Sequence, residues 1–252
     1  MKSSPIDFVR PKQLNGPRIL SWFSLKNPQI QGDGQRIKGL NVGFNSHESQ
    51  EVILQNLHTL CEAANINVKK LALAKQVHGD HVEVIHSSGF YDNTDAFVTR
   101  ESDVPLVIQV ADCGAVLLGD SKNKVIGAAH AGWRGAVKGI AAKTVREMIK
   151  LGAEADSIHV FVSACLSEHN FEVGEEVAEQ FSEHLVNRIN FEKPHVNLQG
   201  LIIEQLENEG VPGKNIEVDD RCTIDHSDLF YSYRREKDES GRMAAIIKLN
   251  KI

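Results

Sequence analysis

The chain has 252 residues with 34 acidic and 28 basic side chains, so its formal net charge is −6. This acidic balance, without a cluster of lysine or arginine to offset it, argues against a nucleic-acid partner. The first residues lack the apolar core of a signal peptide, and no window approaches the roughly 20 apolar residues of a membrane helix. Four widely spaced cysteines do not predict a disulfide scaffold. We therefore expect a cytoplasmic protein without nucleic-acid or membrane partners.

The first half of the chain combines short strands with one helix. Strands are predicted at 18–25 and 40–45, the second continuing into a loop. Apolar residues between 46 and 64 recur with helical spacing. The strand-like stretches 71–76 and 82–85 flank His78-Gly79-Asp80, which predicts a hairpin with the histidine at its bend.

The second half contains near-continuous apolar runs followed by helical patterns. Buried strands are predicted at 105–110, 115–118 and 124–129, and further strands at 158–162, 216–218 and 243–249. Helices are predicted from about 137 to 149, at 173–185 and at 198–208. The elements do not alternate strictly between strand and helix, so a doubly wound nucleotide fold is not favoured. The pattern indicates a mixed α+β architecture in one domain over residues 1–252.

Three short segments place a potential metal ligand at the end of a strand-like run: Gln76-Val77-His78-Gly79-Asp80, Ala111-Asp112-Cys113-Gly114 and Ala129-His130-Ala131-Gly132-Trp133-Arg134-Gly135. Each ligand alone has an ordinary explanation, since a lone histidine often caps a turn and a free cysteine is usually a small buried hydrophobe. Their coincidence at three strand ends favours a shared site. Two imidazoles and one thiolate suit zinc, and three protein ligands leave a fourth position for water or substrate.

Several arginines are candidates for anion binding. Arg134 stands where a glycine-rich turn leads into a predicted helix, and a helix N-terminus offers free N–H groups to an anion. Its planar guanidinium matches phosphate or carboxylate, although an ordinary surface arginine in such a turn has the same pattern. Arg234, Arg235 and Arg242 supply further cations, unless they mark a solvated strand edge.

Asp112 is adjacent to Cys113 and is a candidate either for orienting a metal ligand or for acid/base chemistry. Tight turns also favour aspartate for backbone reasons, which is the structural alternative. The chain has no Gly-x-Gly-x-x-Gly segment and no Walker loop, which argues against dinucleotide or P-loop chemistry.

With these segments the chain resembles the YfiH-like purine nucleoside phosphorylase family, also described as the laccase-domain or polyphenol oxidase family. The resemblance extends from about Asn41 to Leu249 and rests on blocks in this order: Asn41-Val42-Gly43, Gln76-Val77-His78-Gly79, Ala111-Asp112-Cys113, His130-Ala131-Gly132-Trp133-Arg134-Gly135, Phe171-Glu172-Val173-Gly174-Glu175-Glu176-Val177, Asp220-Arg221-Cys222-Thr223 and Ser232-Tyr233-Arg234-Arg235. It implies a compact α/β/β/α-like single domain, with mixed sheets flanked by helices. It also implies a zinc ion held by His78, Cys113 and His130, with copper as the alternative metal.

The resemblance further implies phosphorolysis of adenosine, inosine, guanosine and methylthioadenosine, with adenosine deamination as a second activity. The partners are then purine nucleosides and phosphate, and we expect a monomer. Arg134 is the first choice for phosphate, supported by Arg234 or Arg235, and Asn41 is a candidate for the ribose hydroxyls. Cys113 then serves as a thiolate ligand and not as a nucleophile.

The chain departs from the family pattern in two places. Ala115 stands two residues after the cysteine where the family carries proline, and Ser163-Ala164-Cys165-Leu166-Ser167 replaces Gly-Pro-Cys-Ile-Gly. The metal ligands are intact, so these departures bear on substrate preference, because a loop after a central strand helps to shape the pocket.

Three other functions fit parts of the pattern. A cysteine hydrolase would use Cys113 as nucleophile and His130 as base, and it would work after chelation. A copper-dependent polyphenol oxidase would commonly use an axial methionine, but Met1, Met148 and Met243 lie outside the motifs. A non-catalytic zinc-binding module would need a fourth protein ligand, and the motifs offer three.

Overall fold

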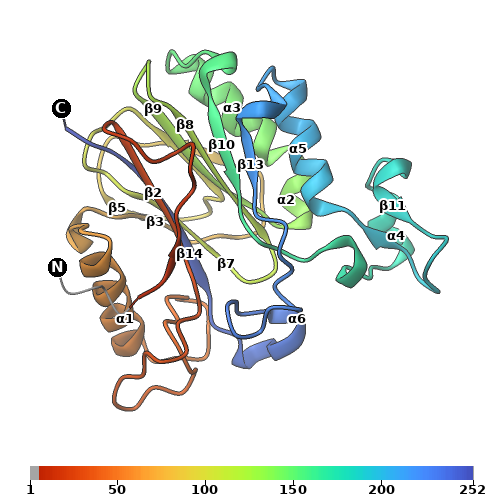
Figure 1. Cartoon of the computed structure of the whole chain (residues 1–252), viewed down its shortest axis with the longest axis horizontal. Helices are drawn as coiled ribbons and strands as arrows, with labels where there is room; N and C mark the ends of the chain where they lie inside the picture. The colour runs from red at the N-terminus through yellow and green to blue at the C-terminus, as the bar shows by residue number, and fades with distance from the viewer. Residues whose placement is uncertain (1–5, 252) are drawn as a thin grey trace.

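The protein folds into two mixed β-sheets that face each other, with helices on their outer sides. The computed structural model describes residues 6–251. In Figure 1 the layers run from helix α1 (Gln50–Ala63) at the left, through both sheets, to α3 (Ile140–Lys150) and α5 (Leu198–Asn208) at the right. The α/β/β/α-like arrangement expected from the sequence is confirmed.

Each of the two sheets has six strands. The first sheet contains, in spatial order, β1 (Phe8–Val9), β2 (Ile19–Ser24), β14 (Met243–Leu249), β7 (Leu106–Val110), β3 (Ala72–Ala74) and β5 (Gly89–Tyr91). The second contains β13 (Ile216–Val218), β10 (His159–Val162), β8 (Gly114–Asp120), β9 (Val125–Ala131), β6 (Ala96–Thr99) and β4 (Val82–Val84). The shorter elements are α2 (Trp133–Val137), α4 (Glu175–Ala178), α6 (Tyr233–Glu236) and the strand pair β11 (Val186–Asn187) and β12 (His195–Val196).

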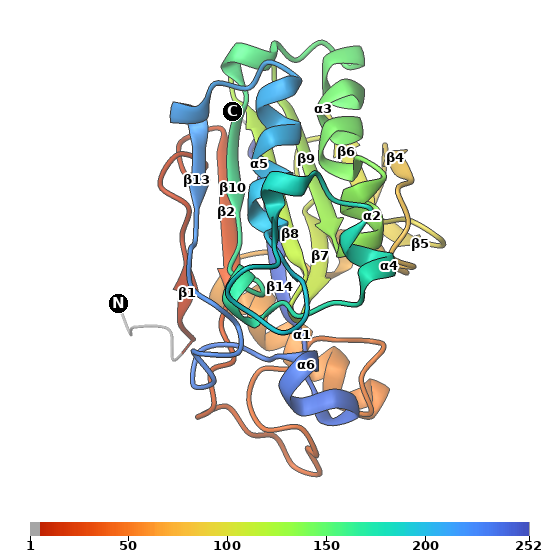
Figure 2. The ribbon, with the colours of Figure 1, turned by 90° about the vertical axis from the view of Figure 1, so that its right-hand side faces the viewer.

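Strand alternation divides the apolar side chains between the layers. In β2, Phe23 lies between the two sheets, whereas its neighbour Trp22 packs on the side of α1. In β8, Leu117 faces the first sheet and Leu118 belongs to the cluster formed with α3 and α5. Figure 2 shows these two helices in front of the strands of the second sheet. Because both faces of the central strands are covered, the strands form near-continuous apolar runs in the sequence.

Most of the long predicted elements are present close to their predicted bounds. These are α1, α3 and α5 among the helices, and β2, β7, β8, β9, β10, β13 and β14 among the strands. Strands β5 and β6, which frame the turn around Asp95, were not predicted. Within residues 6–251, no helix is long and apolar enough to cross a lipid bilayer.

The predicted hairpin around His78 is wrong. Strand β3 pairs in parallel with β5 and β7 of the first sheet, whereas β4 pairs in parallel with β6 of the second. The segment that carries His78 therefore crosses from one sheet to the other. Two adjacent strand-like runs do not reveal whether they pair with each other or with distant partners, which is why the sequence pattern misled.

Three further predictions need correction. The stretch 40–45 forms no strand, although residues 40–43 are buried: the carbonyl of Val42 accepts a side-chain hydrogen bond from Gln109 in place of a strand partner. The predicted helix at 173–185 is reduced to α4 and a short 3-10 turn, since Ser182 takes an extended backbone. The helix predicted over 137–149 is preceded by the separate α2, and Gly139 in a left-handed conformation (φ 83°) divides them.

Candidate metal centre and its cavity

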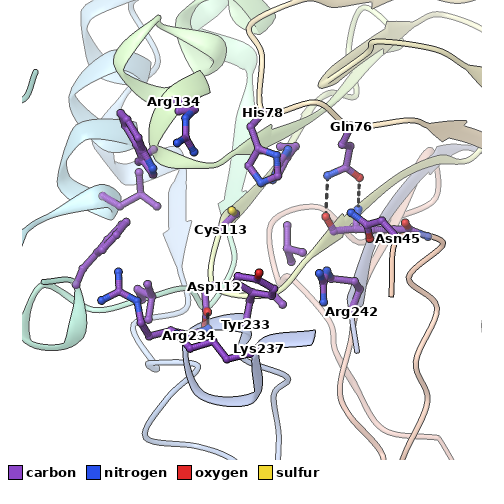
Figure 3. Close-up of a pocket in the computed structure, with 18 residues that line it drawn as sticks. Asn45, Gln76, His78, Asp112, Cys113, Arg134, Tyr233, Arg234, Lys237 and Arg242 are labelled. Atoms are coloured by element: carbon purple, nitrogen blue, oxygen red, sulfur yellow. Dashed lines mark hydrogen bonds between the residues drawn. The ribbon is translucent and has the colours of Figure 1, made fainter. Parts of the chain in front are cut away.

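His78, Cys113 and His130 converge at one end of the two sheets. Their potential ligand atoms all lie within 4.8 Å of one another, and this is the group of metal-ligand type found among residues 6–251. His78 lies on the segment that leaves β3, Cys113 on the turn between β7 and β8, and His130 near the end of β9. Figure 3 shows the side chains of His78 and Cys113 pointing into a common space.

The backbone near these ligands is unusual. His78 (φ 58°) and Asp112 (φ 79°) are non-glycine residues with positive φ, a conformation that costs about 1–3 kcal/mol. Gly132 leaves the room that the ligands need, because a Cβ atom there would lie 3.0 Å from both the Cys113 sulfur and the His78 ring. The glycine of the third segment is thus explained by close packing against the other two.

Asp95, which the sequence analysis did not select, joins the two histidine ligands. One oxygen of its fully buried carboxylate lies 2.8 Å from Nδ1 of His130 and accepts the backbone N–H of His78 at 3.0 Å. The other oxygen accepts the N–H groups of Val77 and Gly79 at 3.2 and 2.7 Å. These bonds hold the left-handed segment in place and leave Nε2 of His130 for a metal.

The charges of the ligands are strongly coupled in the metal-free protein. Burial opposes ionisation of Cys113, but His130 and His78 outweigh it and lower the thiol pKa to about 6. Burial likewise opposes protonation of His130, yet Cys113 and Asp95 raise its pKa to about 9. A thiolate beside an imidazolium results. Binding of a metal would displace the imidazolium proton, since metal ligands must be deprotonated.

The donor set fits a transition metal. Two imidazoles and a thiolate lie within coordination reach of one point, an outer carboxylate orients one imidazole, and the described chain provides no fourth ligand at that point. Three protein ligands with an open position form the arrangement of catalytic metal sites, whereas structural sites are closed. The three ligand residues line a cavity.

The cavity has a volume of about 450 Å³ and two chemically different walls. One wall is apolar and consists of Trp133, Leu166, Phe171 and Leu198. The other is polar and includes Asn45, Gln76, Gln109 and Arg242, and Lys237 lines the cavity beside Arg234 (Figure 3). The amide of Gln76 pairs with both backbone groups of Gln109, as the dashed lines in Figure 3 show, so that part of the wall is held rigidly.

Four cations line the cavity, and among residues 6–251 none of them has an acidic partner: Arg134, Arg234, Lys237 and Arg242. Other arginines of the described chain are neutralised, such as Arg146 by Glu209 and Arg221 by Asp219. Asp112 is the carboxylate of the cavity lining. A cavity with a local cationic excess in an acidic protein is suited to an anionic ligand.

Asp112 lines the cavity, but both of its oxygens accept hydrogen bonds from the protein. Oδ1 accepts the hydroxyl of Thr223 at 2.6 Å, and Oδ2 accepts the backbone N–H of Arg234 at 2.6 Å. Asp112 therefore ties the turn that carries Cys113 to helix α6. This geometry supports a positioning role, and the acid/base role considered from the sequence stays a prediction.

Two residues selected from the sequence lie outside the cavity lining. Asn41 is fully buried, and its side-chain oxygen accepts the backbone N–H groups of Gly43 and Arg242. Arg235 donates from its guanidinium to the carbonyls of Thr223, Ile224 and Phe230 and to the carboxylate of Glu236. Both side chains are therefore bonded within the protein, and their contact with substrate stays a prediction.

Arg134 and Arg234 do line the cavity. The guanidinium of Arg134 is exposed and lies 4.4 Å from the ring of Trp133. That of Arg234 donates to the carbonyl of Glu172 and lies 5.6 Å from the ring of Phe171. The expected long helix behind Arg134 is absent, because α2 has five residues, so a helix dipole adds little there.

The chain is similar in sequence to a known protein family and to several named proteins. A family profile described as multi-copper polyphenol oxidoreductase laccase matches residues 30–250. The purine nucleoside phosphorylase of Deinococcus radiodurans is 38% identical over 218 residues, which cover 84% of this chain and 82% of that protein. The adenosine deaminase RL5, from an unknown prokaryotic organism, is 29% identical over 237 residues, which cover 87% and 90%.

Solved structures agree with this placement. The crystal structure of YlmD from Geobacillus stearothermophilus matches with a TM-score of 0.87 at 22% identity, over 96% of this chain and 94% of that one. YfiH from Bacillus licheniformis matches with a TM-score of 0.85 at the same identity. With the ligand segments, the fold and the family profile in agreement, the chain belongs to the laccase-domain family of YfiH- and YlmD-like proteins.

Proposed function

We propose that this protein is a zinc-dependent purine nucleoside phosphorylase. The observation that carries the proposal is a three-ligand metal group that opens onto a cavity with an apolar aromatic wall and an excess of unpaired cations. Purine nucleoside phosphorylase is also the name of the Deinococcus relative. The substrates proposed are adenosine, inosine, guanosine and methylthioadenosine, each with inorganic phosphate.

Phosphorolysis makes three demands on a site. An oxygen of phosphate attacks C1′ of the ribose, and the bond from C1′ to the purine nitrogen breaks. The electron pair of that bond leaves with the base, which takes up a proton, and ribose 1-phosphate is formed. The site must therefore hold an anion, expose C1′ on the side opposite the base, and support the departing purine.

The residues of the cavity meet these demands by position and charge. The cations attract phosphate and screen the charge that it brings toward the base. The rings of Trp133 and Phe171 offer stacking surfaces of the size of a purine. Because Leu166 and Leu198 extend the same wall, water is excluded from the base on that side.

The metal would be held by His78, Cys113 and His130. Bound zinc supplies Lewis-acid polarisation and a water of lowered pKa. The protein's part is to fix the ligands: Asp95 orients His130, and Asp112 fixes the turn before Cys113. We also propose adenosine deamination as a second activity, in which water replaces the amino group and ammonia is released, because a relative carries the name adenosine deaminase.

Two other functions remain to be distinguished by experiment. A Cys113–His130–Asp95 arrangement with a lowered thiol pKa also matches a cysteine hydrolase, but the second imidazole of His78 beside the thiolate favours a metal. A copper oxidase of the blue-copper type commonly uses an axial methionine. Met148 and Met243 do not line the cavity, and the sulfur of Met243 accepts the N–H of Tyr231.

The deciding experiment combines metal replacement with a phosphate requirement. The protein is stripped with a chelator, dialysed, and reconstituted with zinc or with copper. Release of hypoxanthine from inosine is then followed with and without phosphate. We expect release only with zinc and phosphate, together with stoichiometric ribose 1-phosphate. Equal release without phosphate would indicate a hydrolase, and full activity of the chelated protein would indicate cysteine catalysis.

A further inference from the structure

Arg242 differs from the other cavity cations in how it is held. It is half-buried, and Nη1 donates to the carbonyls of Ser240 and Gly241, each at 2.8 Å. Among residues 6–251, its Nε and Nη2 have no hydrogen-bond partner. One edge of the guanidinium is thus fixed by the protein, while the other donors face the cavity that Arg242 lines. Figure 3 shows the guanidinium on the side of Tyr233, and its Cζ lies 5.6 Å from the centre of that ring.

The segment Asn41-Val42-Gly43 is built around this arginine. The side chain of Asn41 accepts the backbone N–H of Arg242 at 2.9 Å, and the carbonyl of Arg242 accepts the N–H of Val42 at 3.3 Å. A Cβ atom on Gly43 would lie 2.3 Å from Cγ of Arg242, so only glycine leaves room for the side chain. Among its other contacts, this sequence block therefore positions one cation.

A guanidinium removed from water without an acidic partner is costly to a protein unless a ligand supplies the opposite charge. Burial lowers the pKa of Arg242, which reflects this loss of hydration. Lys237, which also lines the cavity, is exposed and has no ion-pair partner among the described residues.

The opposite side of the metal ligands is different in character. In Figure 3, Arg134 and Arg242 lie on opposite sides of His78 and Cys113. Arg134 is exposed and rests on the ring of its own neighbour, Trp133. Displacement at C1′ needs the incoming phosphate and the leaving base on opposite faces of the ribose. Arg134 rests on Trp133 at one end, and Arg242 lies over the ring of Tyr233 at the other, with its Nε and Nη2 donors unpaired among the described residues. Binding of phosphate at the Arg242 end and of the base at the Trp133 end would provide that separation.

We infer that Arg242, assisted by Lys237, is the anchor for inorganic phosphate, and that the purine lies at the opposite end against Trp133 and Phe171. This assignment rests on the proposed phosphorolysis and replaces Arg134 as the phosphate residue. The polar wall would then bind phosphate, a tetrahedral oxyanion, and the aromatic wall would bind the planar purine base.

The test is a set of Michaelis constants for phosphate and for inosine in the zinc-loaded enzyme. Arg242→Gln should raise the phosphate constant roughly tenfold to hundredfold, which is the effect of losing a hydrogen bond to a charged group, with the inosine constant changed less than about threefold. Arg242→Lys should recover part of the loss, because it keeps the charge and not the fork. Lys237→Gln, an exposed change, should raise the phosphate constant about threefold to tenfold.

Two variants serve as comparisons. Arg134→Gln should leave the phosphate constant within about twofold and raise that of inosine, because it disturbs the aromatic end. Arg146→Gln, which loses an exposed ion pair with Glu209 on the outer face, should change neither constant. Bound zinc and the melting temperature are measured for every variant. If Arg242→Gln unfolds, the exposed Lys237→Gln still decides the question.

The outcomes separate this inference from the proposed function. If the wild-type protein needs no phosphate, the proposed function fails first. If it needs phosphate, but Arg242→Gln and Lys237→Gln keep its phosphate constant while Arg134→Gln raises it, only the assignment of Arg242 is overturned. Cleavage of inosine 5′-monophosphate is measured in addition. Loss of its cleavage in Arg242→Gln, with an unchanged phosphate constant for inosine, would assign the arginine to a substrate-borne phosphate and overturn the inference.

Discussion

The two sides of the cavity are built on opposite principles. On the metal side, the polar groups that position the ligands are satisfied inside the protein: each oxygen of Asp95 accepts more than one hydrogen bond, and Asp112 is bonded to Thr223 and α6. On the cationic side, Arg242 and Lys237 lack an acidic partner among the described residues. Internal satisfaction fixes geometry before a ligand arrives, whereas unsatisfied charge leaves binding energy for the ligand. The metal side is therefore fixed before binding, whereas the cationic side keeps its charge available for the ligand.

The largest effect is expected when one of the metal ligands is removed. Cys113→Ala should abolish stoichiometric zinc binding and phosphorolysis, since the loss of a direct ligand exceeds the roughly 10–100-fold effect of an outer partner. Metal analysis after dialysis and the inosine assay measure it. Cys61→Ala is the matched control, because that buried thiol lies on α1 and burial raises its pKa to about 12. Full zinc occupancy in Cys113→Ala would refute the ligand assignment.

The next largest effect is expected at Asp95, which tests whether the scaffold acts through the histidines. Asp95→Asn keeps hydrogen-bonding capacity but loses the charge that orients His130, so zinc affinity should fall about 10–100-fold. Competition with a chromophoric chelator measures the affinity, and the absorption spectrum of the cobalt-substituted protein reports ligand geometry. Asp92→Asn, an exposed change in the same turn, should alter neither. An unchanged affinity and spectrum in Asp95→Asn would reduce Asp95 to a loop-stabilising residue.

The smallest effect is expected for the ion pair that Glu236 makes on helix α6, the helix just before Lys237. Glu236 of α6 pairs with Lys26 at 2.9 Å, and although burial opposes ionisation, Lys26 and Arg235 lower its pKa. Glu236→Gln should therefore cost about 1 kcal/mol of unfolding free energy at neutral pH. The pKa of Glu236 is lower in the folded than in the unfolded protein. The full contribution is therefore present above the pKa of an ordinary glutamate, and it is lost as the pH falls through the lowered pKa of the folded state.

Denaturant titrations of wild type and Glu236→Gln across the acidic range measure this difference. Glu239→Gln removes an exposed pair with Arg36 and should change stability by less than about 1 kcal/mol at any pH. A difference for Glu236→Gln that grows as the pH falls would contradict the sign of the pKa shift. The phosphate constant should change little in either variant.

Local patterns in the sequence predicted the strands and helices whose apolar faces are long, and also the three ligand segments. They did not predict that the segment through His78 crosses between sheets, because pairing partners are set by contacts distant in sequence. Asp95 gave no local signal beyond an acidic residue before an apolar run. The motifs also did not reveal that Asn41 and Arg235 bond to backbone groups, because a polar residue in a motif can bond either to the backbone or to a ligand.

The left-handed backbone at His78 and Asp112 bears on whether the protein stays folded without a metal. In small zinc modules the metal supplies the folding energy, and the apo chain is unfolded. Here the strained turns are held by hydrogen bonds to buried carboxylates and by packing between the sheets. We therefore expect the apoprotein to remain folded and ready for loading.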